Sequence, residues 1–201
     1  MRKFQLALAA LLLASCAAPA LVGTEITPTA APDFTLTDGI SGKPITLSSQ
    51  QGTVIVLSFL YTHCLDVCPL TAERFRMAQL LLTADERDHT LFVAVSVDPR
   101  QDTPDAVQSF ARDHGLAKGF VFLVGGAAQL QPVWSAYGIG IETDPTVTGV
   151  GHSDAIYLLD RKGHVRVLVH SDITADSLAG DLKLLNAERY LRPRLGLYSI
   201  V

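Results

Sequence analysis

Residues 54–71 read VIVLSFLYTHCLDVCPLT, and this stretch decides which fold the chain adopts. It begins with a continuous run of apolar and β-branched residues, which is typical of a central strand covered on both faces. Cys64 and Cys68 follow this run directly, and residues 71–82 are rich in helix-forming residues. The stretch therefore predicts a buried strand that leads into a helix, with two thiols at the junction.

Beyond this junction, predicted strands and helices alternate along the chain. We expect strands at 91–97 and 120–125, helices at 104–114, 127–137 and 174–190, a hairpin at 154–170, and short strands within 33–49. Such alternation implies a mostly parallel sheet with helices on both faces, to which the hairpin adds antiparallel strands. The predicted fold class is therefore α/β. The arrangement is thioredoxin-like, with a central mixed sheet flanked by helices, a terminal β-hairpin and a closing helix.

The N-terminus is predicted to be an export signal. Residues 1–15 begin with Arg2 and Lys3, continue with an apolar core and end in small residues. The letters LASC resemble a bacterial lipobox, in which Cys16 is lipidated and becomes the first mature residue. The alternative is an uncleaved anchor, because residues 4–22 are almost long enough to span a membrane. Both interpretations place the domain outside the cytoplasm, as an exported, membrane-tethered protein that faces the periplasm or the cell exterior.

The rest of the chain is predicted to be one domain. Residues 16–32 are small, Thr-rich and Pro-rich without apolar periodicity, which is typical of a flexible membrane tether. Residues 33–201 then form the thioredoxin-like domain, since a chain of 201 residues is short for two domains. The net charge is only −4 and no basic stripe occurs, so we expect no nucleic-acid partner.

The cysteine pair has a chemical rather than a stabilising role in this interpretation. If Cys16 carries lipid, only Cys64 and Cys68 remain in the domain, and so close a pair constrains the unfolded chain little. The start of a helix favours the thiolate form, because its N–H groups and its positive end point at the sulfur. We expect Asp66 as the N-cap of this helix and Pro69 in its first turn.

The spacing of the pair leaves a redox couple and a metal site open. Three residues separate the thiols instead of the two of thioredoxin-type oxidoreductases, and the wider loop allows either a disulfide or two sulfurs on one metal ion. His152 is the candidate third ligand, because it precedes the hairpin in a loop that faces the cysteine turn in thioredoxin-like folds. The alternative for His152 is a hydrogen bond to the backbone beside a tight turn. His63 is expected to point away from Cys64, and the remaining histidines are expected at the surface: His89, His114, His164 and His170.

Two thiolates and one imidazole form a soft, three-coordinate donor set. Structural zinc would demand a fourth protein ligand, and none is evident in the sequence. Thiolates select Cu(I), which accepts low coordination, and imidazole also suits Cu(II). Copper is therefore the metal that this donor set favours.

Three blocks of the sequence resemble the Sco/SenC family of copper-binding, thioredoxin-like proteins. They are SFLYTHCLDVCPLT (58–71), VAVSVDPRQDTPDAVQSFARDHG (93–115) and HSDAIYLLDRKGHV (152–165), and the resemblance runs from about residue 32 to residue 185. It implies that Cys64, Cys68 and His152 bind one copper. It further implies that the protein delivers copper to the CuA site in subunit II of cytochrome c oxidase, or keeps that site reduced.

Two further details of the resemblance concern the DxxxDTP loop and residue 65. The family's DxxxDTP loop is matched by Asp98, Asp102, Thr103 and Pro104, and we interpret Asp102 and Thr103 first as helix-capping residues, with partner docking as the alternative. Leu65 stands where many members of the family have proline, which removes no ligand.

Four functions are considered, of which the last is a tethered domain whose cysteine pair is vestigial. The first is a copper metallochaperone, which binds and transfers the ion rather than catalysing a reaction. The second is a thiol–disulfide oxidoreductase that keeps the CuA-site cysteines reduced, with Cys64 and Cys68 as its redox pair. The third, a peroxiredoxin, fails because neither cysteine follows the Pro-x-x-x-Thr-x-x-Cys pattern of that chemistry.

Overall fold

The computed structural model of the chain describes residues 20–116, 118–142 and 149–188. The predicted signal peptide and the predicted lipidation site at Cys16 lie outside the described residues. Within the described part of the chain, no helix is both long enough and apolar enough to cross a membrane.

Three parallel strands form the centre of the sheet. They are β4 (Val54–Leu60), β5 (Thr90–Ser96) and β6 (Phe120–Val124), with β5 between the other two. Every residue of β4 is buried, which explains why this strand is continuously apolar instead of alternating. The prediction of a buried strand before the cysteines is confirmed.

The sheet has eight strands in the order β1-β10-β9-β4-β5-β6-β2-β3. The outer strands are β1 (Thr24–Ala30), β2 (Thr35–Asp38), β3 (Pro44–Thr46), β9 (Ile156–Leu159) and β10 (His164–Val169). β9 pairs antiparallel with β4 and with β10, so the predicted terminal hairpin extends one edge of the parallel core. The sheet is therefore mixed, as the sequence predicts.

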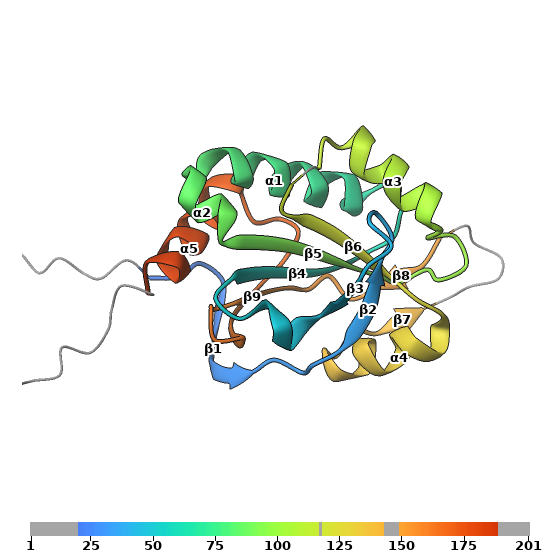
Figure 1. Cartoon of the computed structure of the whole chain (residues 1–201), viewed down its shortest axis with the longest axis horizontal. Helices are drawn as coiled ribbons and strands as arrows, with labels where there is room; N and C mark the ends of the chain where they lie inside the picture. Colours follow the sequence, from blue (N-terminus) through green and yellow to red (C-terminus); the bar gives the residue numbers. More distant parts are fainter. Residues whose placement is uncertain (1–19, 117, 143–148, 189–201) are drawn as a thin grey trace, which may run out of the picture.

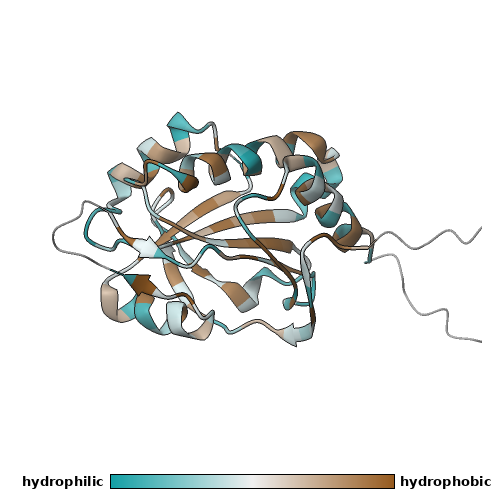
Figure 2. Ribbon diagram, turned by 180° about the vertical axis from the view of Figure 1, so that it is seen from behind, coloured by the Kyte–Doolittle hydropathy of each residue, from teal (hydrophilic) through white to brown (hydrophobic). Residues whose placement is uncertain are grey.

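Helices cover both faces of this sheet (Figure 1). They are η1 (Leu47–Gln50), α1 (Val67–Leu81), α2 (Ala84–Asp88), α3 (Pro104–Asp113), α4 (Ala127–Ala136) and α5 (Ala175–Ala187). In Figure 1, α1 and α3 lie on one side of the sheet and α4 on the other, while α5 packs against α1. Figure 2 shows that the hydrophobic residues concentrate in the central strands between these layers. The ring pair Phe75 and Phe92, with centroids 5.1 Å apart, joins α1 to β5 in this core.

Three of these helices, α2, α3 and α5, begin after a threonine that caps them. Thr103 accepts a hydrogen bond from the backbone N–H of Ala106, and Pro104 is the first residue of α3, as predicted. α5 begins after Thr174 in the same way and ends at Ala187, three residues before the predicted end. The short helix α2 was not predicted, although its capping box is readable in the sequence.

The prediction of a flexible tether over residues 16–32 is wrong for Thr24–Ala30. These residues form β1, which pairs antiparallel with β10 in a register that sets Thr24 opposite Leu168. β1 is an edge strand with mostly exposed side chains, so it shows no apolar alternation and its composition resembles a linker. Its pairing depends on β10, far along the chain, and the folded domain therefore begins before residue 33.

Candidate metal and redox site

Cys64 and Cys68 lie at the junction of β4 and α1, as predicted. Cys64 is in the connection, and Cys68 is the second residue of α1, followed by Pro69 within the first turn. Asp66 occupies the N-cap position, but its side chain makes no capping hydrogen bond. Instead, the backbone N–H of Cys68 donates to the Sγ of Cys64 at 3.4 Å. The first thiol thus takes the place of the capping oxygen at the positive end of the helix.

The two thiols differ in their electrostatics. A hydrogen bond from the Cys68 side chain lowers the pKa of Cys64 most strongly, and backbone N–H groups of Asp66 and Cys68 add to this against the opposing effect of burial. The same hydrogen bond, together with complete burial, raises the pKa of Cys68. Both cysteines are free in this structure. Cys64 is therefore the thiol of the pair that loses its proton first, because its pKa is lowered while that of Cys68 is raised.

His152 lies next to the cysteine loop. It belongs to β8 (Gly151–His152), which pairs with β7 (Ile141–Glu142). Its ring meets the ring of Tyr61 edge-on, with centroids 6.0 Å apart and an interplanar angle of 82°. Tyr61 directly follows β4 and also touches Cys64, since its hydroxyl helps to lower the pKa of that thiol. The structure thus brings His152 to the cysteine junction through one shared neighbour.

One nitrogen of His152 is engaged with the backbone. Nδ1 lies 3.0 Å from the carbonyl oxygen of Ser153. A carbonyl oxygen only accepts hydrogen bonds, so Nδ1 carries the hydrogen and the neutral ring keeps its lone pair on Nε2. The backbone hydrogen bond considered as the alternative therefore exists, and it leaves the other nitrogen available to bind a metal ion.

The predicted ligands are neighbours, but they do not form a closed cluster. Across residues 20–116, 118–142 and 149–188, no three His, Cys, Asp or Glu side chains are grouped closely enough to hold a metal ion. His152 contacts Tyr61 rather than the sulfurs.

The comparison with known proteins now decides the family. The SCO1/SenC family model matches residues 23–186. The chain belongs to the SCO1/SenC family. The start of this match at residue 23 agrees with β1 as part of the domain. The resemblance drawn from the three sequence blocks is therefore confirmed.

Relatives of this SCO1/SenC protein include the mitochondrial protein SCO2 of Saccharomyces cerevisiae, with 32% identity over 137 residues. That match covers 65% of this chain and 44% of the yeast protein, so the chain spans less than half of that relative. The structure of Bradyrhizobium japonicum ScoI with copper bound has a TM-score of 0.65 and 29% identity, covering 78% of this chain and 99% of that one. The structure of apo Sco1 from Thermus thermophilus has a TM-score of 0.72 and 25% identity, covering 83% and 97%. The thioredoxin-like fold predicted from the sequence is confirmed by these structures.

The DxxxDTP loop of this SCO1/SenC protein holds the cysteine loop in place. The backbone N–H and the hydroxyl of Thr62 both donate to Oδ1 of Asp102 at 2.8 Å. The hydroxyl of Ser96, at the end of β5, donates to the other oxygen of Asp102 at 2.5 Å. Asp102 therefore joins the segment after β4 to the end of β5 through hydrogen bonds, whereas Thr103 caps α3. The sequence gives no sign of these hydrogen bonds, since Thr62 and Asp102 are 40 residues apart and no local pattern joins them.

The other histidines have surroundings of their own. His63 is exposed, and its Nδ1 lies 3.0 Å from the hydroxyl of Thr62. The rest contact groups away from the cysteines: His89 contacts Asp85, His114 lies tilted against Phe110, His164 lies near Asp160 and His170 bonds to the carbonyl oxygen of Asp154. Of the six histidines, His152 is the one whose ring contacts Tyr61, which in turn touches Cys64. The role of His152 as a ligand stays a prediction.

Apolar side chains are exposed around the cysteine loop. Leu65, between the two cysteines, is 98% exposed, and Leu70 in the first turns of α1 is about half exposed. A protein that approaches Cys64 therefore meets the exposed side chain of Leu65 beside that of Asp66.

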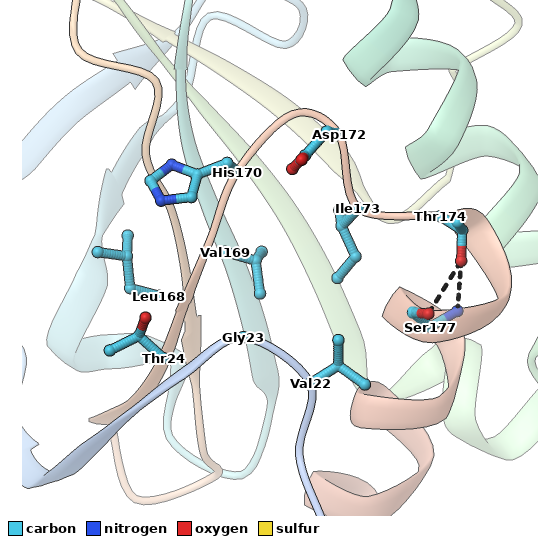
Figure 3. Close-up of a pocket in the computed structure, with 10 residues that line it drawn as sticks. All are labelled: Val22, Gly23, Thr24, Leu168, Val169, His170, Asp172, Ile173, Thr174 and Ser177. Carbon is cyan, nitrogen blue, oxygen red and sulfur yellow. Dashed lines mark hydrogen bonds between the residues drawn. The ribbon is translucent and has the colours of Figure 1, made fainter.

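A separate hollow of about 320 Å³ lies where β1, β10 and the start of α5 meet (Figure 3). Its walls are mainly apolar, and neither cysteine nor His152 lines it. Figure 3 shows Thr174 bonded to Ser177 at its edge, which is the capping interaction of α5. This hollow is therefore not part of the candidate metal site.

Proposed function

We propose that this protein is a copper metallochaperone that holds one copper ion through Cys64, Cys68 and His152. The observation that carries this proposal is that Tyr61 contacts both the thiol of Cys64 and the ring of His152, which lie on either side of it. The copper-bound ScoI of Bradyrhizobium japonicum supports the choice of metal. The acceptor is the CuA site in subunit II of cytochrome c oxidase, as the family resemblance implies.

The donor atoms suit copper. Sulfur is a soft ligand that favours Cu(I), and the free Nε2 of His152 extends the set to Cu(II). Cys64 already favours its thiolate, and Cys68 gives up its proton when the ion binds. Because binding releases protons, retention of copper weakens in acid.

His152 moves toward the sulfurs when the ion binds. It sits in a ladder of only two residue pairs, Ile141 with His152 and Glu142 with Gly151. So short a ladder has little stability of its own, so the imidazole can turn toward the sulfurs while Tyr61 keeps its segment beside the cysteine loop. In transfer, thiolates of the acceptor replace the sulfurs of Cys64 and Cys68 on the ion, so copper passes over without a change of oxidation state.

A Cu(I) titration of the reduced protein against a competing chelator tests this function. We expect one tight site per chain, lost in Cys64→Ser and strongly weakened in His152→Ala. His63→Ala is the matched control, because it removes an exposed histidine beside the same loop and should leave the affinity unchanged. Equal affinities of His152→Ala and the wild type would contradict the three-ligand site.

The difference in pKa between Cys64 and Cys68 favours a second candidate function, a thiol–disulfide oxidoreductase that keeps the CuA cysteines reduced. The thiolate of Cys64 would attack a target disulfide, form a mixed disulfide and release one target thiolate. Cys68, once deprotonated, would attack Cys64 and release the second, leaving a Cys64–Cys68 disulfide and a reduced target. If the protein is this oxidoreductase, we expect His152→Ala to retain full reductase activity. A reduction potential of the Cys64–Cys68 couple above that of the target disulfide would exclude this role.

The protein is anchored to a membrane in this proposal, through lipid on Cys16. Export would place the domain on the periplasmic or outer side, where the CuA domain of the oxidase is accessible. Cys16→Ala should release the protein from the membrane fraction and abolish labelling with a fatty acid. Labelling that persists in this variant would contradict the assignment.

A further inference from the structure

Tyr61 lies between the cysteine loop and the segment that carries His152, and it contacts both. It follows β4 directly and is only 9% exposed, so its position is fixed by the end of the central strand. Its backbone carbonyl accepts the N–H of Cys64 at 3.4 Å, which forms the turn that carries the first thiol. Its ring meets the ring of His152 edge-on at 6.0 Å.

The hydroxyl of Tyr61 fits against the segment that carries His152. A Cβ atom at Gly149 would lie 3.3 Å from this hydroxyl oxygen, tighter than most carbon contacts. Gly149 also has a φ of 134°, a conformation that side chains disfavour. The backbone of Val150 adds a hydrogen bond to the hydroxyl. The chain therefore approaches Tyr61 closely just before His152, and glycine makes that approach possible.

We propose that Tyr61 is a positioning residue: its ring and hydroxyl hold the His152 segment against the cysteine loop and set the approach of the imidazole to the sulfurs. This inference rests on the proposed metal site. It follows from two contacts with different partners, the ring with His152 and the hydroxyl with Gly149 and Val150. The residues that would bind the ion are thus oriented by one that does not, as is usual around metal ligands.

Two variants separate the contributions of the ring and the hydroxyl. Tyr61→Phe keeps the ring and removes the hydroxyl, whereas Tyr61→Leu removes both. Gly149→Ala perturbs the same contact from the other side and leaves Tyr61 intact. Tyr157→Phe is the matched control, because it deletes a hydroxyl that donates to the carbonyl oxygen of Tyr137 at 2.7 Å.

The first readout uses metal-free protein. The ring-proton resonances of His152, measured by NMR, should shift in Tyr61→Leu because the edge-on contact is lost, and should stay near the wild type in Tyr61→Phe and Tyr157→Phe. The second readout is Cu(I) affinity by chelator competition. We expect Tyr61→Leu and Gly149→Ala to bind about 10-fold more weakly or worse, Tyr61→Phe to fall between them and the wild type, and Tyr157→Phe to be unchanged.

Folded Tyr61→Leu with wild-type His152 resonances and wild-type affinity would overturn the inference. If that variant does not fold, Gly149→Ala with unchanged affinity overturns it instead. A wild-type protein that binds no Cu(I) would refute the proposed function. The metal-free spectra would then still decide whether Tyr61 positions His152.

Discussion

Asp181 belongs to α5, and its carboxylate is buried against the N-terminal part of the domain. Replacing this carboxylate tests how α5 packs there. The side chain is 1% exposed. One carboxylate oxygen accepts the backbone N–H of Val22 at 2.8 Å, and the other has no partner among the described residues. Burial, together with repulsion from Glu25, raises the pKa of Asp181 from 3.8 to about 6, against the opposing effect of the Val22 N–H.

The size of the effect on the free energy of unfolding follows from the linkage between protonation of Asp181 and folding. At about 1.4 kcal/mol per pKa unit, ionised Asp181 costs the folded state about 3 kcal/mol. The folded state holds the proton more tightly than the unfolded chain does, so this cost is absent at low pH and appears as the pH rises from about 4 to about 6. Asp181→Asn keeps an oxygen for Val22 and stays neutral at every pH.

Chemical denaturation of both proteins at several pH values measures this effect. The unfolding free energy of Asp181→Asn minus that of the wild type should increase by about 2 kcal/mol between pH 4 and pH 7. Any cost of the new amide is the same at every pH and cancels from this increase. Asp176→Asn, an exposed carboxylate on the same helix, controls for the change in net charge. A difference that stays flat from pH 4 to pH 7 would refute the reasoning.

Three further predictions concern the cysteines, a helix cap and the core. Cys64 should react with iodoacetamide at a pH below the range of an ordinary thiol, since its pKa is lowered, whereas buried Cys68 should react only after unfolding; equal rates would contradict the assigned thiolate. Thr103→Ala should lower the unfolding free energy by about 1 kcal/mol through loss of the α3 cap, and a neutral result in denaturation would argue against that cap. Phe75→Ala should lower it by about 3–5 kcal/mol, because the fully buried ring packs on Phe92; a loss below 1 kcal/mol would show a core that refills the cavity.

The sequence sufficed for those parts of the fold that local patterns determine. The continuous apolar run of β4 has one structural solution, a strand covered on both faces, and the structure confirms it. Thr103 with Pro104 marks the start of α3 by chemistry within four residues. The position of the cysteines follows from the apolar run of β4, since they come directly after it, where the strand ends and α1 begins.

The missed features depend on contacts between distant residues. β1 pairs with β10 across more than a hundred residues, and its exposed side chains carry no periodic signal. Asp102 resembles a cap in the sequence, yet its carboxylate bonds to Thr62 because two strand ends meet. The approach of Tyr61 to His152 likewise arises only from the fold, although Gly149 is a local sign that some group comes close there.

X-ray absorption at the copper edge, on reduced protein loaded with one equivalent of Cu(I), tests the proposed site most directly. We expect two sulfur ligands and one nitrogen ligand in the wild type, with the nitrogen lost in His152→Ala and retained in His63→Ala. A wild-type spectrum with sulfur ligands alone, identical to that of His152→Ala, would contradict it.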